Sequence, residues 1–228
     1  MSKNKLRHIA FILDGNKRWA KKKKLSDLEG YKKGFENIKH IVNHALDIKI
    51  KNVTLFTLSS ENFKRPSLNI IYDLIYNNFS NFIDELITKR NVKVKIFGSR
   101  NNLPSRINKI FDKAERISAD NEKLYLNLAF NYGFKEEIQE VLKKFKNGIK
   151  EINIEDEQDI RKLFYLNNQS DPEILVRTGG YNRLSNFIMY NLTYTELFFS
   201  KTLWPEFSTD ELDQIIKDFF NIKRTYGL

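Results

Sequence analysis

The 228-residue chain contains no cysteine and only three histidines. Disulfide bonds, thiol catalysis and cysteine-ligated metal sites are therefore excluded, and the composition is compatible with a reducing compartment without proving one. Long apolar runs are also absent, since none reaches the ~18 residues that a membrane-spanning helix requires. The basic amino terminus leads into an apolar stretch of only about seven residues, which is too short for the core of a signal peptide. We therefore expect a soluble, cytoplasmic protein.

Several familiar site motifs are missing as well. The sequence has no Walker-type nucleotide loop, and no Gly-x-Gly-x-x-Gly motif follows the first predicted strand. His40 and His44 lie one helical turn apart, a spacing that can bind a metal, but with no acid expected beside them a structural role is favoured. The candidates for chemistry are therefore the polar clusters that follow predicted strands.

Basic residues outnumber acidic ones, which gives the chain a formal net charge of +10. Such a charge implies an anionic partner, and nucleic acid, a membrane surface and phosphorylated substrates all qualify. Part of the charge is also what a genome of biased composition would produce, given the abundance of Lys, Asn and Ile. Because the sequence shows no platform of basic and aromatic residues, we expect no nucleic-acid binding.

Apolar periodicity predicts strands and helices that alternate along the chain. The predicted strands are 8–13, 53–58, 92–97, 124–129, 173–176 and a region within 192–199; the predicted helices are 31–49, 66–89, 104–117, 134–146, 160–166 and a last one opened by a capping box at Ser208–Glu211. Such alternation is typical of βαβ units and a parallel sheet. We therefore expect one α/β domain over residues 1–228, with a roughly six-stranded, mostly parallel sheet flanked by helices.

The first apolar strand ends abruptly at Asp14, and Gly15 and Asn16 follow. Ligand sites of α/β proteins lie beyond the carboxyl ends of parallel strands. Gly15 permits close approach of a ligand, and Asn16 can cap a helix whose free N–H groups favour an anion. An acid beside an anion site suggests Mg²⁺, which takes carboxylate and phosphate oxygens. The stretch indicates Mg²⁺-phosphate chemistry, although the same three residues also form ordinary turns.

Polar clusters follow two other predicted strands. Ser59–Pro66 follows the second strand, and Arg177–Phe187, with two arginines, a glycine pair and a serine, follows the fifth. Arginine forks and the N–H groups of glycines make the latter a candidate anion cradle, with arginines paired to surface acids as the alternative. Glu196 lies among apolar residues of the sixth strand region, where burial would require a partner or a metal; a surface position is the alternative.

The helix predicted at 66–89 has an apolar stripe wider than one contact with a sheet demands. A core helix is the ordinary explanation, and a helix that also walls an apolar cavity is the other. An apolar cavity beside clusters that suit phosphate would fit an oily substrate with a diphosphate head.

Five blocks of sequence, in order, carry a family resemblance. They are Asp14–Ala20, Ser59–Pro66, Asn127–Gly133, Arg177–Phe187, and Tyr194–Leu197 together with Leu203–Pro205. These blocks resemble the signatures of the cis-prenyltransferases, the family of undecaprenyl diphosphate synthase, and they span nearly the whole chain. The resemblance implies an α/β fold with a hydrophobic tunnel. It also implies a Mg²⁺-dependent enzyme that condenses isopentenyl diphosphate onto an allylic diphosphate, such as farnesyl diphosphate, with undecaprenyl diphosphate for the cell-wall lipid carrier as the default product.

Carried over by position, the resemblance assigns roles to individual residues. Asp14 and Asn62 are expected to be catalytic, and Asp14 and Glu196 are expected to bind Mg²⁺. A neutral amide is a poor base, so Asn62 is interpreted as a positioning or relay group. The residues expected to bind substrate are Gly15, Asn16, Lys17, Arg18, Trp19, Ser59, Ser60, Glu61, Phe63, Arg65, Arg177, Arg183, Leu184 and Ser185.

The resemblance also implies a place for the growing chain and for partners. The helices predicted at 31–49 and 66–89, with Phe56 and Leu124, are the expected wall of the tunnel. Family members pair as homodimers, and an oily product must leave the enzyme. We therefore expect a homodimer that contacts a membrane surface transiently.

The chain departs from the family pattern near the expected site. A family glycine is Lys17, an arginine is Asp27, a histidine is Tyr31, and the acid after the glycine pair is Tyr181. Asp27 and Tyr31 are therefore left out of the expected diphosphate site. A catalytically silent partner subunit is the competing hypothesis. Because such partners usually lack the metal-binding aspartate that this chain keeps, we expect an active enzyme.

Overall fold

The computed structural model describes residues 5–65, 67–146 and 152–223, so the predicted helix start at Pro66 lies outside the described residues. The strands are β1 (His8–Ile12), β2 (Asn52–Ser59), β3 (Val92–Phe97), β4 (Leu124–Tyr132), β5 (Ile174–Arg177) and β6 (Glu196–Phe199). The α-helices are α1 (Asn16–Lys23), α2 (Asp27–Asp47), α3 (Leu68–Phe82), α4 (Ser105–Ile117), α5 (Phe134–Lys146), α6 (Glu157–Arg161) and α7 (Thr209–Asn221). Four short 3₁₀ or π segments within the described residues are η1 (Ser60–Lys64), η2 (Ile83–Lys89), η3 (Met189–Leu192) and η4 (Trp204–Glu206).

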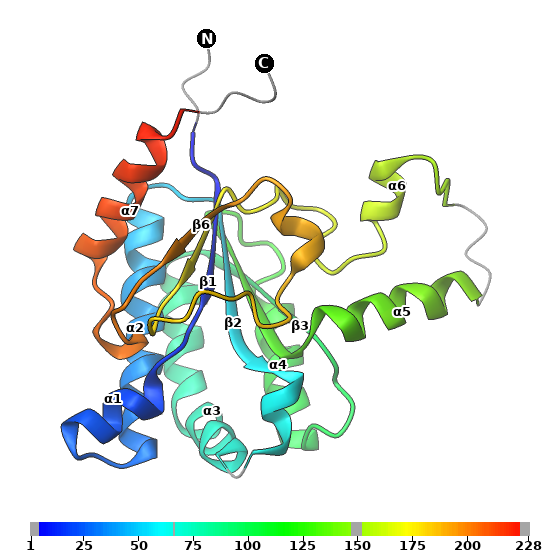
Figure 1. The fold of residues 1–228 in the computed structure, drawn as a ribbon. Helices are drawn as coiled ribbons and strands as arrows, with labels where there is room; N and C mark the ends of the chain where they lie inside the picture. Colours follow the sequence, from blue (N-terminus) through cyan, green and yellow to red (C-terminus); the bar gives the residue numbers. More distant parts are fainter. Residues whose placement is uncertain (1–4, 66, 147–151, 224–228) are drawn as a thin grey trace.

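The strands of the described chain form one sheet in the order β3-β4-β2-β1-β5-β6, and every neighbouring pair is parallel. The prediction of an α/β fold with a six-stranded sheet is confirmed, and the sheet is wholly rather than mostly parallel. Strands β2, β1 and β5 are adjacent, with helices packed around the sheet (Figure 1). The three polar clusters predicted after these strands are therefore neighbours in space.

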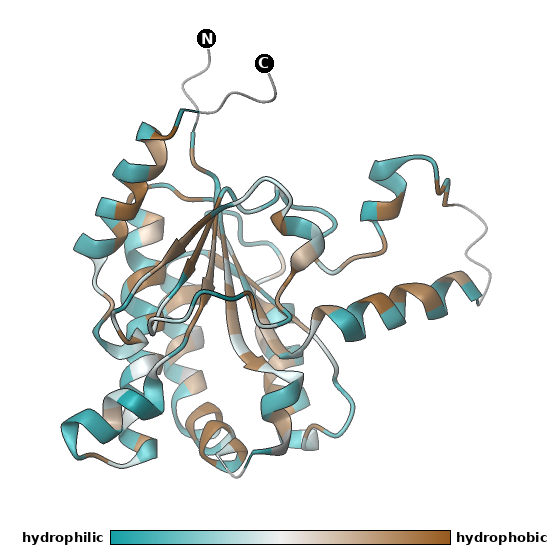
Figure 2. Ribbon diagram, viewed as in Figure 1, coloured by the Kyte–Doolittle hydropathy of each residue, from teal (hydrophilic) through white to brown (hydrophobic). Residues whose placement is uncertain are grey.

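Successive residues of each strand alternate between two buried faces of the sheet. Ile9 and Phe11 of β1 belong to the core shared with α2, α3, α4 and α7, whereas Ala10 and Ile12 pack with Phe187 and its neighbours in the loop after β5. The strands are accordingly apolar on both sides, as their brown colour in Figure 2 shows. The core next to α2, α3, α4 and α7 is therefore separate from the core on the other face of the sheet.

Some predicted elements have different bounds in the structure. The helix predicted at 66–89 is α3, which continues as the π-helical segment η2, and the helix predicted at 160–166 lies earlier, as α6. The strand region predicted at 192–199 is reduced to β6, because the 3₁₀ turn η3 delays the strand until Glu196. The helix predicted at 134–146 coincides with α5.

The helix ends follow local hydrogen bonding. At α7 the Ser208 hydroxyl accepts a hydrogen bond from the N–H of Glu211 at 3.1 Å, as predicted, but the Glu211 carboxylate accepts from Ser200 instead of closing the capping box. A complete capping box of Ser26 and Glu29 opens α2. None of the described helices combines the length and the apolar character that a bilayer crossing needs.

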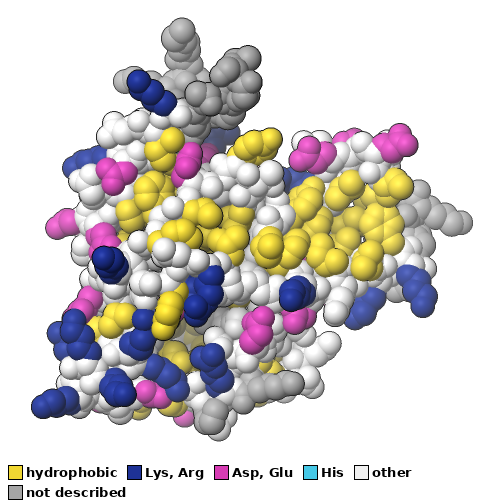
Figure 3. All heavy atoms as spheres, viewed as in Figure 1, with side chains coloured by type: hydrophobic (Ala, Val, Ile, Leu, Met, Phe, Trp, Pro, Cys, Tyr) yellow, Lys and Arg dark blue, Asp and Glu magenta, His cyan; other side chains and the backbone are white. Residues whose placement is uncertain are grey.

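Hydrophobic side chains gather on the outer surface over α5 and α6, apart from the main sheet (Figure 3). Val141 of α5 clusters with Leu163 and Phe164 of the segment after α6, and Ile160 of α6 packs against this cluster. Leu142, one residue further along α5, is 61% exposed. This part of the chain therefore presents an apolar surface as well as a small core of its own.

Candidate active site

A pocket of about 600 Å³ opens at the carboxyl ends of β1, β2 and β5. Parallel strands direct the loops that follow them to one edge of the sheet, so segments distant in the sequence share one pocket. Most of the residues predicted for the site line it, namely Asp14, Gly15, Asn16, Lys17, Ser59, Glu61, Asn62, Arg65, Arg177, Arg183 and Ser185. The structure thus brings the first, second and fourth sequence blocks together.

Asp14 is held by cations on both carboxylate oxygens. Oδ2 accepts a hydrogen bond from Nη2 of Arg177 at 2.9 Å, and Oδ1 accepts from Nη2 of Arg18 at 3.0 Å. Thr178 fixes the backbone here, because its hydroxyl oxygen accepts from the Asp14 N–H at 3.1 Å and lies 2.8 Å from the Asp14 carbonyl oxygen. The carboxylate is therefore fixed in position at the wall of the pocket.

Arg177 is buried, with 3% of its side chain exposed. Its Nη1 donates to the Ser185 hydroxyl at 2.6 Å and to the carbonyl oxygen of Arg183, so the loop after β5 folds back over the guanidinium. Its Nε is buried and has no hydrogen-bond partner among the described residues. A buried donor without an acceptor is costly, and an oxygen of an anionic ligand in the pocket would supply the acceptor.

The turn after β1 requires a glycine at position 15. Gly15 has a φ of +121°, and a Cβ there would lie 2.9 Å from Leu203. Gly15 is also the N-cap of α1, so the predicted capping role of Asn16 is wrong: Asn16 is the first helical residue, and its side chain donates to the Leu13 carbonyl at 3.3 Å. The first N–H groups of α1, which lack helical acceptors, consequently lie at the wall of the pocket.

The segment after β2 supplies a second wall. The Ser59 hydroxyl accepts from the Asn62 N–H at 3.3 Å and so caps η1, and the Glu61 carboxylate accepts from the side-chain amide of Asn186 at 3.0 Å. Partial burial alone would raise the pKa of Glu61, but hydrogen bonds from its own N–H, Asn186 and Ser59 outweigh it and lower the pKa. Glu61 is therefore an anion at neutral pH, and its bond to Asn186 joins the clusters after β2 and β5.

Two departures from the family pattern contact each other. The Lys17 ammonium lies 2.8 Å from the Asp27 carboxylate, where the chain reverses between α1 and α2. A cation is thus present at position 17, at the wall of the pocket, while position 27 carries its counter-ion. Tyr31, which the prediction leaves out, also lines the pocket, with its hydroxyl 3.5 Å from that of Ser67.

Other predicted site residues support the pocket without lining it. They are Arg18, Trp19, Ser60, Phe63 and Leu184. Arg18 contacts Asp14, and its Nη1 also donates to the carbonyl of Gly179 at 2.6 Å. Trp19 is buried, and Phe63 and Leu184 pack against the cores on opposite faces of the sheet. Their side chains stabilise the walls from behind.

Glu196 lies toward the opposite end of the sheet from Asp14. It pairs with Ile174, the first residue of β5, whereas Asp14 contacts Arg177, the last residue of that strand. The distance along β5 from Ile174 to Arg177 is about 10 Å. The two residues therefore lie at different levels of the sheet within one chain, and their joint role in binding Mg²⁺ stays a prediction. The sequence identifies a strand region here but not the residue at which the strand begins.

The described residues contain no group of three or more His, Asp or Glu side chains that could hold a metal ion. The carboxylates of Asp14 and Glu61 line the same pocket, beside cations that suit phosphate. One or two carboxylates combined with substrate phosphate oxygens are the usual ligands of Mg²⁺ in phosphate chemistry. This donor set fits Mg²⁺ that binds together with a diphosphate, and it does not fit a site built from protein ligands alone.

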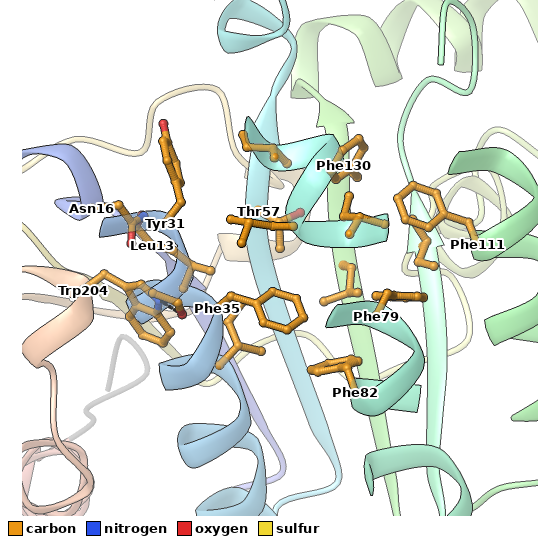
Figure 4. Close-up of a pocket in the computed structure, with 17 residues that line it drawn as sticks. Leu13, Asn16, Tyr31, Phe35, Thr57, Phe79, Phe82, Phe111, Phe130 and Trp204 are labelled. Atoms are coloured by element: carbon orange, nitrogen blue, oxygen red, sulfur yellow. Dashed lines mark hydrogen bonds between the residues drawn. The ribbon is translucent and has the colours of Figure 1, made fainter. Parts of the chain in front are cut away.

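An apolar cavity of about 110 Å³ adjoins the polar pocket. Phe35 of α2 and Phe79 and Phe82 of α3 converge on it (Figure 4). The two spaces share the lining residues Leu13, Asn16, Tyr31, Thr57 and Ile71. The helical walls lie where they are predicted, but the predicted strand residues do not line the cavity: Phe56 belongs to the other face of the sheet and Leu124 lies elsewhere in the core.

Several residues at the site escape the sequence prediction. Thr178 and Asn186 lie inside the block that starts at Arg177, but their bonds to Asp14 and Glu61 join different strand ends and leave no local signal. Tyr181 also lines the pocket, and only its departure from the family pattern marks it in the sequence. Thr57 and Ser67 line the pocket without any signal that a single sequence could show.

The chain matches known proteins over nearly its whole length. The family model described as "Putative undecaprenyl diphosphate synthase" matches residues 12–227. An isoprenyl transferase of Lactobacillus johnsonii is 39% identical over 99% of this chain and 98% of its own length. An isoprenyl transferase of Enterococcus faecalis is 38% identical over 96% of this chain and 84% of its own.

Two solved structures share the fold. Lavandulyl diphosphate synthase from Lavandula x intermedia, in complex with dimethylallyl diphosphate, gives a TM-score of 0.91 at 28% identity, over 97% of this chain and 98% of that one. A probable undecaprenyl diphosphate synthase from Campylobacter jejuni gives a TM-score of 0.77 at 28% identity, over 99% and 100% of the two chains. Together with the pocket geometry, these matches identify an enzyme. The chain is a prenyltransferase that belongs to the undecaprenyl diphosphate synthase family.

Proposed function

We propose that the protein elongates an allylic diphosphate by successive cis condensations with isopentenyl diphosphate, with Mg²⁺ as its cofactor. Farnesyl diphosphate is the proposed primer, and undecaprenyl diphosphate for a cell-wall lipid carrier is the proposed product. The observation that carries the proposal is the contact between two unlike spaces, a cationic pocket around Asp14 and an apolar cavity walled by α2 and α3. A diphosphate head and an isoprenoid tail would account for both. Residues 1–228 would act as one catalytic domain.

The pocket would stabilise the charge that develops as the allylic carbon–oxygen bond breaks. The electrons of that bond leave with the diphosphate, so preorganised donors favour this state over the ground state. Lys17 and the first N–H groups of α1 would bind the departing diphosphate, and Arg18 behind the wall would add positive charge to the pocket. Asp14 would orient Arg18 and Arg177 and hold Mg²⁺. When bound, Mg²⁺ would neutralise part of the diphosphate charge.

Isopentenyl diphosphate would bind to the loop after β5. Arg177 offers its unpartnered Nε to the diphosphate, and Arg183 and Ser185 line the same wall. Carbon C4 would attack the allylic C1 as the first diphosphate leaves with the electrons of the broken bond. C2 would lose its proton to an oxygen of the departing diphosphate, and the new double bond would be cis. Asn62 lines the pocket and would position the reacting groups, since a neutral amide is a poor base.

The apolar cavity would receive the growing chain. At about 110 Å³ the cavity is small, so its walls on α2 and α3 would adjust as the chain grows. The lining is dominated by Phe, Leu and Ile side chains, which can move without breaking hydrogen bonds. The side chains of such a wall would rearrange around an isoprenoid tail and exclude water from it.

We propose that two copies pair through the apolar surface over α5 and α6. Leu142 and Phe145 of α5 and Ile154, which precedes α6, are exposed. Figure 3 shows hydrophobic side chains gathered over these helices. Exposed apolar patches mark interfaces between proteins. Leu142→Lys should convert a dimer to a monomer in light scattering, whereas Ile117→Lys, at an exposed position of α4, should not.

We propose that the enzyme works in the cytoplasm and contacts a membrane surface through the turn between α1 and α2. Leu25 is exposed in this turn and Leu28 is exposed at the start of α2, next to the exposed run Lys21–Lys24. Exposed leucines flanked by lysines suit a surface of anionic lipid headgroups. Leu25→Glu should reduce co-sedimentation with anionic vesicles, and binding by the variant equal to that of the wild type would exclude this contact.

The function is tested by incubation with farnesyl diphosphate, labelled isopentenyl diphosphate and Mg²⁺, with products resolved by chain length. Wild type should make long cis-polyprenyl diphosphate, and Asp14→Ala should lose at least about 100-fold in activity. Asp47→Ala is the matched control, since Asp47 pairs with Arg90 at 2.5 Å and does not line the pocket. A single condensation product would contradict elongation. Well-folded wild type that makes no product would favour the silent partner subunit.

A further inference from the structure

The ring of Tyr181 lies beside three arginines at the polar pocket. Its centroid is 4.3 Å from Cζ of Arg183, 4.6 Å from Cζ of Arg18 and 5.9 Å from Cζ of Arg177. All three distances fall within the ~6 Å range of attractive cation–π contacts. The side chain lines the pocket and is 42% exposed. It is therefore placed to act on the cations of the site without being part of the core.

A guanidinium presents two kinds of surface to its neighbours. Its planar faces stack on aromatic rings, whereas its N–H groups donate in the plane. Arg18 and Arg177 contact the Tyr181 ring and still donate to the carboxylate of Asp14. An aromatic ring thus attracts the cations without accepting hydrogen bonds from the N–H groups that an anionic ligand needs. A carboxylate at position 181 would compete with such a ligand for these N–H groups.

The backbone before Tyr181 is anchored. The N–H of Gly179 donates to the Thr202 carbonyl at 2.7 Å, and the N–H of Gly180 donates to the Ser200 carbonyl at 2.8 Å. Both glycines have positive φ, which lets the chain make these bonds and turn toward the pocket. The ring therefore stands on a segment tied to the strand end of β6.

We propose that Tyr181 is a positioning residue that holds Arg18, Arg177 and Arg183 in place for a diphosphate group through cation–π contacts. The three guanidiniums repel one another, and the negative face of the ring offsets part of that repulsion. Without the ring, a diphosphate would have to order the arginines as it binds. That the bound anion is a substrate diphosphate rests on the proposed function. The effect of Tyr181 on the binding of an anion can be measured without turnover.

Calorimetric titration with inorganic pyrophosphate tests the pocket alone. Tyr181→Leu should bind pyrophosphate about 5- to 10-fold more weakly than wild type, because the cation–π contacts are lost. The KM for isopentenyl diphosphate should rise by a similar factor while kcat changes little. Tyr181→Phe keeps the ring and should restore wild-type values. Tyr125→Leu is the control, since it removes a cation–π contact with Lys93 at 5.6 Å outside the pocket.

Two results would overturn the proposal. One is wild-type pyrophosphate affinity in Tyr181→Leu, and the other is a Tyr181→Phe variant as weak as Tyr181→Leu, which would assign the effect to the hydroxyl. Thermal unfolding of the variants should match wild type, because the side chain is partly exposed. If pyrophosphate binding depends on Tyr181 but no prenyl product forms, the proposed function fails and the positioning role stands. If product forms and pyrophosphate binds equally well with and without the ring, the positioning role fails and the proposed function stands.

Discussion

The two ends of the parallel sheet both carry polar side chains but use them differently. At the carboxyl end, charged groups surround a pocket of about 600 Å³, and Nε of Arg177 has no partner within the described chain. At the amino end, His8, Thr54 and Asn127 are fully buried. Thr54 contacts Nε2 of His8 at 2.7 Å and accepts from Asn127 at 3.1 Å, and Asn127 exchanges hydrogen bonds with Gln169.

This difference separates a ligand site from a structural network. Buried polar groups that satisfy one another stabilise a single packing, whereas the charged groups at the carboxyl end surround an open pocket and include a donor without a protein partner. Asn127 illustrates the point, because it belongs to a block that carries the family resemblance and yet lies at the amino end of the sheet, here called the closed end. Membership of a family motif does not by itself place a residue in the catalytic pocket.

The largest expected effect on activity is at the carboxyl end of the sheet, here called the open end. Arg177→Gln should lower kcat/KM by about 10²- to 10³-fold, as removal of a preorganised charge-stabilising donor does in other enzymes. Steady-state kinetics on folded protein would measure it. The counterpart is Arg161→Gln at the other end of the sheet, where Arg161 donates to Asp171 at 2.7 and 2.9 Å. An equal catalytic loss in that variant would remove the distinction between the two ends.

The closed end should make stability depend on pH. Burial, opposed by a hydrogen bond to Ser170 and the charge of Asp171, lowers the pKa of His8 from 6.5 to about 4. Between these values the unfolded chain binds a proton that the folded chain does not. The free energy of unfolding should therefore fall by about 3 kcal/mol as pH drops through this window. Urea denaturation at several pH values would measure the fall, and His8→Gln should abolish this component.

A smaller loss of stability is expected from the amide in the same network. Asn127→Leu should lower the free energy of unfolding by about 1–3 kcal/mol, because Gln169 would lose both of its hydrogen bonds to Asn127 and Thr54 would keep only its contact with His8. Activity per folded molecule should be unchanged. The double variant Asn127→Leu with Gln169→Leu should recover part of the loss, and a double variant that is less stable still would show that the network is not a closed unit.

The smallest effect is expected at the rim of the pocket. The ion pair of Lys17 and Asp27 is partly exposed, so Asp27→Asn should change the free energy of unfolding by less than about 1 kcal/mol. Pyrophosphate should bind slightly more tightly at low ionic strength, because Lys17 is released from its counter-ion, and the gain should vanish in high salt. Tighter binding that persists in high salt would point to a change of pocket shape instead.

The open end was easier to predict from the sequence than the closed end. Polar residues that directly follow apolar strands are visible in the sequence, so Asp14, Ser59 and Arg177 could be placed at one edge of a parallel sheet. His8 and Asn127 lie inside strands instead. Their contacts with Thr54 depend on the register of β2 against β1 and β4, which a single sequence does not reveal.

The errors in the predicted site have similar causes. The alternation of side chains shows that Phe56 and its neighbours point to opposite faces of β2, but not which face carries α3. The position of Glu196 depends on η3, a turn formed by tertiary packing, which sets where β6 begins. Tyr181 is visible in the sequence only as a departure from the family pattern; its contacts with three arginines follow only from the distances between side chains.

The loop of Asp14 depends on residues from near the other end of the chain. Leu203 packs against Gly15, the N–H of Trp204 donates to the Asp14 carbonyl at 3.0 Å, and the Trp204 indole donates to the Gly34 carbonyl at 2.8 Å. During synthesis on the ribosome, the first strands and α2 emerge long before these partners. A nascent chain can therefore form the strands β1 to β4 before the loop of Asp14 has its supports, and that loop is completed only after residues 203 and 204 have emerged.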